Sequence, residues 1–144
     1  MSRSGYTDDY EHMNLYRATV QRTINGKKGQ AFLKDLAKAL DEMPEKKLIV
    51  GDLVAESGEV CAIGAVCKTR GLDVSGVDVD DAERVGKLVG ISRPLAAEIE
   101  FENDEGAYYR NKNESPEERW VRVRKWVSEN ITTGSQPPPV GEKK

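Results

Sequence analysis

The sequence has few of the residues on which enzyme chemistry most often depends. Among its 144 residues there is one histidine, His12, and there are two cysteines, Cys61 and Cys67. A Ser/His/Asp triad or a histidine-based zinc site could be built only around His12, and its sequence neighbours read as an ordinary solvated helix face. The cysteines are six residues apart, which does not match the two-residue spacing of redox or zinc pairs. The sequence therefore contains no recognisable catalytic set, and we expect no cofactor and no metal bound by these residues.

The chain also lacks a basic excess, a long apolar run and a secretion leader. Its 22 basic residues are outnumbered by 25 acidic ones, which argues against a general binder of polyanions. No apolar run approaches the roughly 18 residues that a membrane span needs, and Met1 is followed by a polar segment. We therefore expect a protein of the cytoplasm that does not bind membranes, with reduced thiols.

What the chain does contain is strong helix signals, above all near its C-terminal end. Ser115 is predicted to cap a helix, with Pro116 at its first position and Glu118 completing a capping box. Apolar residues then recur at helical spacing, so we expect both Trp120 and Trp126 to be interior. If Trp120 is fully buried, its replacement by alanine should cost about 3 to 5 kcal/mol.

Periodicity and helix-ending residues predict five further helical segments. In chain order these are residues 8–24, residues 30–43, residues 60–70, a short helix around 85–89 that ends at Gly90, and residues 93–104 capped by Ser92. The short connector over residues 25–29 predicts that the first two helices fold back as a hairpin, with the C-terminal helix packed across it. The pattern over residues 47–60 does not decide between strand and helix.

These segments predict a mostly α fold, a compact single domain of five or six helices with at most one short strand or hairpin. We place the domain at residues 8–131, after a flexible start at residues 1–7. Residues 132–144 include three consecutive prolines and no apolar period, so we expect a disordered tail.

An acidic cluster lies toward the end of the 93–104 segment. On a helix, Glu98, Glu102 and Glu105 align at three- and four-residue steps beside Asp104, and such a row repels itself unless a cation or a basic partner meets it. We predict that this acidic ridge of Glu98, Glu102, Asp104 and Glu105 binds a partner, although a solvated face would read the same way. A second alternative is a metal-dependent enzyme that uses Glu98, Glu102 and Asp104, although the spacing matches no calcium loop.

The C-terminal helix offers a different alternative, nucleic-acid binding. Arg122 and Lys125 are predicted to point away from the core, on a basic outer face that could contact phosphates. Because the net charge is acidic, we place this function second to protein binding.

Four stretches resemble a family of small uncharacterised proteins encoded by bacteriophages and prophages. They are residues 26–48, including GQAFL and PEKKL, residues 58–66 with the sequence GEVCAIGAV, residues 102–105 with ENDE, and residues 116–127. The resemblance implies no activity, cofactor or catalytic residue, and gives only a genomic setting. We therefore expect a non-enzymatic phage accessory protein in the host cytoplasm that binds a host or phage protein through its surface.

Overall fold

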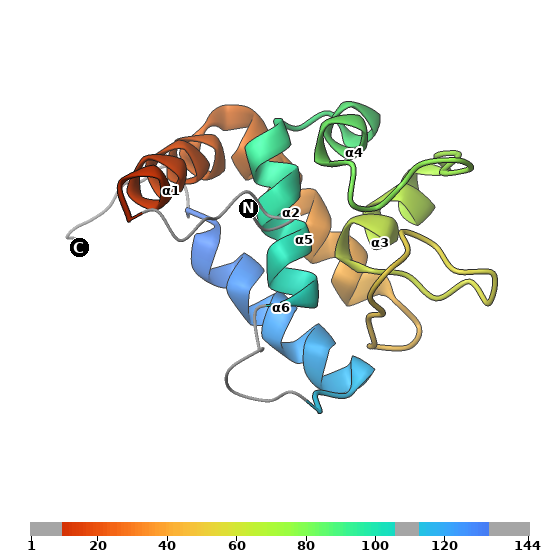
Figure 1. Cartoon of the computed structure of the whole chain (residues 1–144). Coiled ribbons are helices and arrows are strands. Elements are labelled where there is room, and N and C mark those ends of the chain that lie inside the picture. The colour runs from red at the N-terminus through yellow and green to blue at the C-terminus, as the bar shows by residue number, and fades with distance from the viewer. Residues whose placement is uncertain (1–9, 106–112, 133–144) are drawn as a thin grey trace.

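The computed structural model describes the backbone of residues 10–105 and 113–132, and the side chains of these from Leu15 onward. It contains six helices, shown in Figure 1: α1 Tyr10–Asn25, α2 Lys27–Glu42, α3 Ala62–Arg70, α4 Ala82–Val89, α5 Arg93–Asp104 and α6 Pro116–Asn130. No strand occurs within those ranges, and no helix there has both the length and the apolar character to cross a membrane. The predicted mostly helical single domain is confirmed. Residues 1–7 and 133–144, assigned above to a flexible start and a disordered tail, lie outside the described residues.

The helix starts that rest on capping chemistry are confirmed. At α6, the Ser115 hydroxyl accepts a hydrogen bond from the Glu118 amide at 3.0 Å, and the Glu118 carboxylate accepts one from the Ser115 amide at 2.8 Å. Ser92 caps α5 as predicted, by accepting a hydrogen bond from the amide of the third helical residue, Leu95. Asp81 caps α4 in the same way, although no single residue was predicted to cap this helix. These caps satisfy amides that have no partner within the helix, so they fix where each helix begins.

The junction between α1 and α2 is tighter than the sequence suggested. Gly26 alone links the two helices, and α2 begins at Lys27 rather than at Gln30. A side chain at Gly29 could not be accommodated, since a Cβ atom there would lie 1.9 Å from the carbonyl oxygen of Thr23. The predicted fold-back hairpin is wrong: with a single linking residue, α1 and α2 diverge from their junction, and α1 packs on α5 as well (Figure 1).

The C-terminal helix does pack on α2, as predicted. In Figure 1, α6 lies beside α2 and runs in the opposite direction. The Gln30 side chain at the start of α2 joins the end of α6, donating to the carbonyl of Asn130 at 2.9 Å and accepting from the Thr132 amide at 2.8 Å. Val123 and Val127 of α6 are fully buried along this contact.

The tryptophans of α6 flank the core rather than fill it. Trp120 and Trp126 are both half-buried, because Val123 and Val127 occupy the positions that face α2 and α5 most directly. The Trp120 indole donates a hydrogen bond to the carbonyl of Leu40 at 3.2 Å. The prediction that both indoles are interior is therefore wrong, since each tryptophan is only partly buried.

We accordingly expect Trp120→Ala to cost about 2 kcal/mol, less than the 3 to 5 kcal/mol of a fully buried tryptophan, because only part of the ring leaves apolar surroundings. Urea unfolding followed by circular dichroism measures the change. Val121→Ala on the same helix is the control, since Val121 is 63% exposed and should change stability by less than about 0.5 kcal/mol. A loss above about 3 kcal/mol for Trp120→Ala would show that the ring belongs to the core.

Residues 48–60 form neither a helix nor a regular strand. A single antiparallel bridge joins Val54 to Val60. The segment is fixed by backbone hydrogen bonds from the Ile49 amide to the Val60 carbonyl at 2.9 Å and from the Cys61 amide to the Leu53 carbonyl at 3.2 Å. This connection leads directly into α3 and is called the 48–60 segment below.

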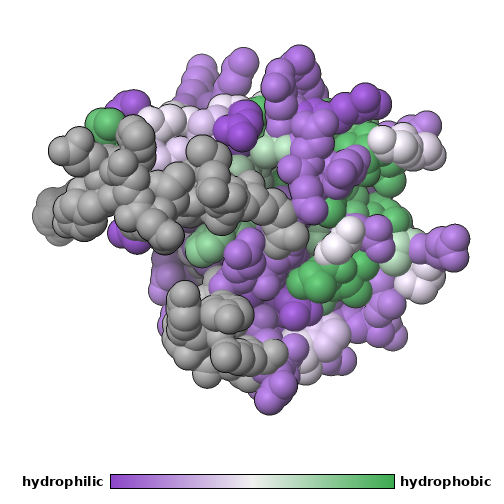
Figure 2. Space-filling view, in the orientation of Figure 1, coloured by the Kyte–Doolittle hydropathy of each residue, from purple (hydrophilic) through white to green (hydrophobic). Residues whose placement is uncertain are grey.

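The surface is hydrophilic over most of the face in Figure 2. Hydrophobic colour gathers on the side where α3, α4 and their adjoining loops lie. Val50, in the 48–60 segment, is 47% exposed, although large apolar side chains are mostly buried in this fold. Apolar surface is thus available beside the loops that flank α3.

Candidate functional site

The acidic ridge does not form an open surface. Glu98 is only 8% exposed, and Glu102, Asp104 and Glu105 are half-buried, each with contacts to other residues. The helical alignment is as predicted, but α5 is covered by α1, α3, α4 and α6, so little of it faces solvent. The expectation of a solvent-facing ridge is therefore wrong at Glu98. A role for the other three carboxylates in partner binding stays a prediction.

The acidic cluster also does not converge on one point. Within the described residues, no three histidine, cysteine, aspartate or glutamate side chains come together in a way that could hold a metal ion. Glu98, Glu102 and Asp104 are all described with their side chains, and they form no such group. This geometry gives no support to the metal-dependent alternative.

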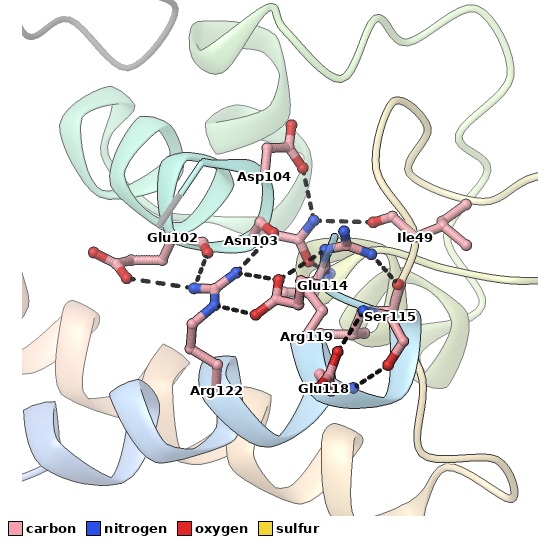
Figure 3. Close-up of polar contacts among 11 residues, drawn as sticks. Ile49, Glu102, Asn103, Asp104, Glu114, Ser115, Glu118, Arg119 and Arg122 are labelled. Carbon is pink, nitrogen blue, oxygen red and sulfur yellow. Dashed lines mark hydrogen bonds and ion pairs between the residues drawn. The ribbon is translucent and has the colours of Figure 1, made fainter. Parts of the chain in front are cut away.

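Arg122 is part of an internal network rather than of an outer basic face. Figure 3 shows its guanidinium between the end of α5 and the residue before the α6 cap. It pairs with both carboxylate oxygens of Glu114, at 2.7 and 3.0 Å, and donates to the carbonyl of Glu102 at 2.6 Å. Its side chain is 16% exposed. The predicted outward orientation of Arg122 is wrong, because the guanidinium binds Glu114 and the carbonyl end of α5.

Arg119 and Asn103 extend the same network to the 48–60 segment (Figure 3). Arg119 donates to the carbonyl of Leu48 at 2.9 Å. Asn103 is fully buried, accepts from the Ala62 amide at 3.0 Å and donates to the carbonyl of Ile49 at 2.9 Å. Arg119 and Asn103 therefore stabilise the irregular backbone of the 48–60 segment.

Of the two residues predicted for nucleic-acid contact, only Lys125 is exposed. Arg122 is occupied internally, so the two do not form a shared phosphate-binding face. Binding of a nucleic-acid backbone needs several cations on one surface. The geometry therefore gives no support to nucleic-acid binding by Arg122 and Lys125 together.

The two cysteines are buried in α3 and at its cap. Cys61 caps the helix by accepting from the Gly64 amide at 3.4 Å, and its thiol lies 3.4 Å from a carboxylate oxygen of the buried Glu100. Burial, followed by the neighbouring Glu100, raises the pKa of the Cys61 thiol well above its ordinary value. Burial also raises the pKa of Cys67. Both thiols are therefore neutral and shielded, the state of structural rather than nucleophilic cysteines.

We expect both thiols to react with Ellman's reagent at least about a hundredfold more slowly in the folded protein than in urea, because reaction requires local opening.

The raised pKa values also predict a pH dependence of stability. Because the pKa of each thiol is higher in the folded than in the unfolded protein, the two thiols stabilise the fold below the ordinary thiol pKa of about 8.5, and this stabilisation is lost as pH rises above it. Stopped-flow labelling with and without urea, and melting temperatures across this pH range, test the two effects. Rapid labelling of either thiol in the native protein would contradict the burial.

A groove opens where α2, α3 and the 48–60 segment meet. Its volume is about 570 Å³. It is lined by the last turns of α2, the link over residues 44–47, the turn over residues 57–60 and one face of α3. Ala39 of α2 and Ala65 of α3 are small residues at the contact between these helices, and the half-buried Met43 adds apolar surface. The groove therefore has an apolar lining built from three separate parts of the chain.

Charged side chains surround this apolar lining. Lys47 joins two sides of the groove, since its ammonium lies 3.3 Å from a carboxylate oxygen of Glu45 and 3.3 Å from one of Glu59. The hydrogen bond to Glu45, with that to Glu59, raises the pKa of Lys47. The hydrogen bond from Ser57, followed by that from Lys47, lowers the pKa of Glu59. Lys47 and Glu59 therefore stay charged near neutral pH.

Sequence reasoning did not identify this groove. Its lining residues come from stretches that were assigned separately to a helix, to an undecided segment and to a second helix. The available signal was local: small residues at 61, 62, 64 and 65 indicated close packing of α3 against a neighbour, but not which neighbour.

Comparisons with protein-family models, with curated proteins and with solved structures give no match for this chain. The resemblance to bacteriophage and prophage proteins therefore stays a prediction.

Proposed function

We propose that this protein acts by binding another protein, and that it takes up a short segment of that partner in the groove between α2, α3 and the 48–60 segment. The observation that carries the proposal is the groove itself, a concavity of about 570 Å³ with an apolar lining and charged edges. An apolar interior with a polar margin is the usual organisation of a protein recognition surface.

The size of the groove favours a segment over a broad interface. A standard protein interface buries about 800 Å² of surface on each partner. The surface area inside this groove is much smaller than that. Short peptide segments bind instead in grooves that take a few side chains, with neighbouring polar groups setting specificity. The proposed complex is thus of the peptide-in-groove kind.

The biological setting follows the sequence expectation. We propose a non-enzymatic accessory protein that works in the cytoplasm of a bacterial host, with a host or phage protein as partner. The resemblance to phage and prophage sequences supports this setting.

Site-specific photocrosslinking tests the proposal. A photoreactive benzoylphenylalanine is placed at Thr69, an exposed residue of α3 that lines the groove, in the full chain expressed in host cells before and during phage infection. We expect a discrete adduct with one protein, identified by mass spectrometry. A segment bound in the groove would lie next to this position.

The matched control places the same photoreactive residue at Lys87 of α4. Its side chain is 78% exposed and does not line the groove. Adducts of equal yield and composition from both positions, or no adduct from Thr69 in either condition, would contradict the proposal. Melting curves of both labelled chains show whether each is folded.

A further inference from the structure

The carboxylates in and near the groove differ in whether they have a cation partner. Asp41, in the last turn of α2, pairs with Arg124 of α6 at 2.8 Å. Glu45 and Glu59 share the ammonium of Lys47. Glu42 lines the groove and is exposed, and its carboxylate has no hydrogen bond or ion pair within the described residues.

Glu42 also lies where a helix least favours a negative charge. The C-terminal end of a helix carries partial negative charge, which repels a carboxylate and attracts a cation. The last turn of α2 contains no basic residue, although Lys46 donates to the carbonyls of Asp41 and Met43 just beyond it. The negative charge of Glu42 therefore does not stabilise the folded protein.

Lys68, a basic residue on the α3 side of the groove, lies where a helix favours its charge. Lys68 occupies the last turn of α3, where a cation is favoured, and it donates to the carbonyl of Gly58 at 2.8 Å. Its charge thus serves α3 and the turn over residues 57–60. Among the carboxylates that line the groove, Glu42 alone has no cation partner within the described residues, and it is followed in the chain by the half-buried, apolar Met43.

We propose that the groove is specific for a partner segment with an arginine or lysine next to an apolar residue, the cation pairing with Glu42 and the apolar side chain entering the groove. This inference rests on the proposed function and names the chemistry of the bound segment. Arginine suits the site well, since its guanidinium can pair with both oxygens of a carboxylate.

Three pentapeptides that differ in one charge test the inference: ALRLA, ALQLA and ALELA, each acetylated and amidated. They are titrated to millimolar concentration into the ¹⁵N-labelled full chain, and amide shifts are followed for the groove residues Gly58, Val60, Ala65 and Thr69. We expect ALRLA to bind at least about threefold more tightly than ALQLA, and ALELA to bind most weakly, because charge pairing adds to apolar burial.

Two variants separate recognition from folding. Glu42→Gln should weaken ALRLA binding about threefold while raising the melting temperature by about 1 to 2 °C, since an unfavourable charge leaves the end of α2. Glu42→Lys should weaken binding about tenfold. The control, Glu83→Gln on α4, removes an exposed glutamate that does not line the groove and should leave binding unchanged.

The outcomes distinguish this inference from the proposed function. Equal binding of the three peptides in the groove would overturn the charge preference and leave a groove that takes apolar segments. Tighter binding of ALELA, unchanged affinity in Glu42→Lys, or no shift of groove residues with any peptide would also overturn it. The proposed function fails separately, if the Thr69 photocrosslink yields no specific adduct.

Discussion

Replacing Gly64 with alanine should destabilise the protein by about 3 kcal/mol, although the same change in an ordinary helix stabilises by about 1 kcal/mol. A Cβ atom at Gly64 would lie 1.7 Å from the carbonyl oxygen of Leu53 and 2.7 Å from the carbonyl carbon. Both are backbone atoms, so the 48–60 segment would have to move away from α3. That movement would break the hydrogen bond from the Cys61 amide to the Leu53 carbonyl.

Urea unfolding of the full chain measures the effect. Gly26→Ala is the matched control: a Cβ atom there would lie 3.4 Å from the nearest backbone oxygen, that of Arg22, and we expect a change below about 1 kcal/mol. Any stabilisation by Gly64→Ala would show that the 48–60 segment does not pack against α3 as described.

Asn103→Leu should produce the second large loss, about 3 to 5 kcal/mol, while keeping the volume of the side chain nearly constant. The substitution removes the partners of two backbone groups, the buried amide of Ala62 and the partly buried carbonyl of Ile49. Each group left unsatisfied costs about 1 to 3 kcal/mol, because it cannot recover a hydrogen bond from water. The size of the effect reflects the burial of Asn103, which is fully enclosed.

The same unfolding assay applies, with Asn25→Leu as control at an exposed position that should change stability by less than about 0.5 kcal/mol. A loss below about 1 kcal/mol for Asn103→Leu would mean that water reaches the two backbone groups. In that case the 48–60 segment would be held by other contacts.

The helices were predictable where their determinants are local. Ser115, Glu118 and the other capping residues act within four positions of the groups they bind, so their effect can be read from a short window of sequence. The start of α2 was placed three residues late because the glycines at positions 26 and 29 resemble a helix break. One of them, Gly29, is instead required for the close approach to Thr23.

The 48–60 segment was not predictable for the opposite reason. Its backbone conformation is held by Asn103, 54 positions from Ile49, and by Arg119, 71 positions from Leu48. The candidate acidic ridge failed similarly. Helical spacing aligned its carboxylates correctly, but the burial of Glu98 depends on which helices cover α5, and this follows only from the tertiary fold.

The same distant contacts connect the fold to the proposed site. Asn103 and Arg119 fix the start of the 48–60 segment, and the bridge between Val54 and Val60 carries that order to the turn that lines the groove. The network in Figure 3 thus fixes the start of the segment whose end lines the groove. The exposed carboxylate of Glu42 is available for recognition.

The central claim is that the groove between α2, α3 and the 48–60 segment is where this protein meets its partner. Hydrogen–deuterium exchange of the full chain, with and without the partner identified by photocrosslinking, tests it most directly. We expect slower exchange on binding in peptides that cover residues 39–47 and 57–69. Protection confined to residues 98–105 and 122–125, or protection nowhere, would contradict the claim.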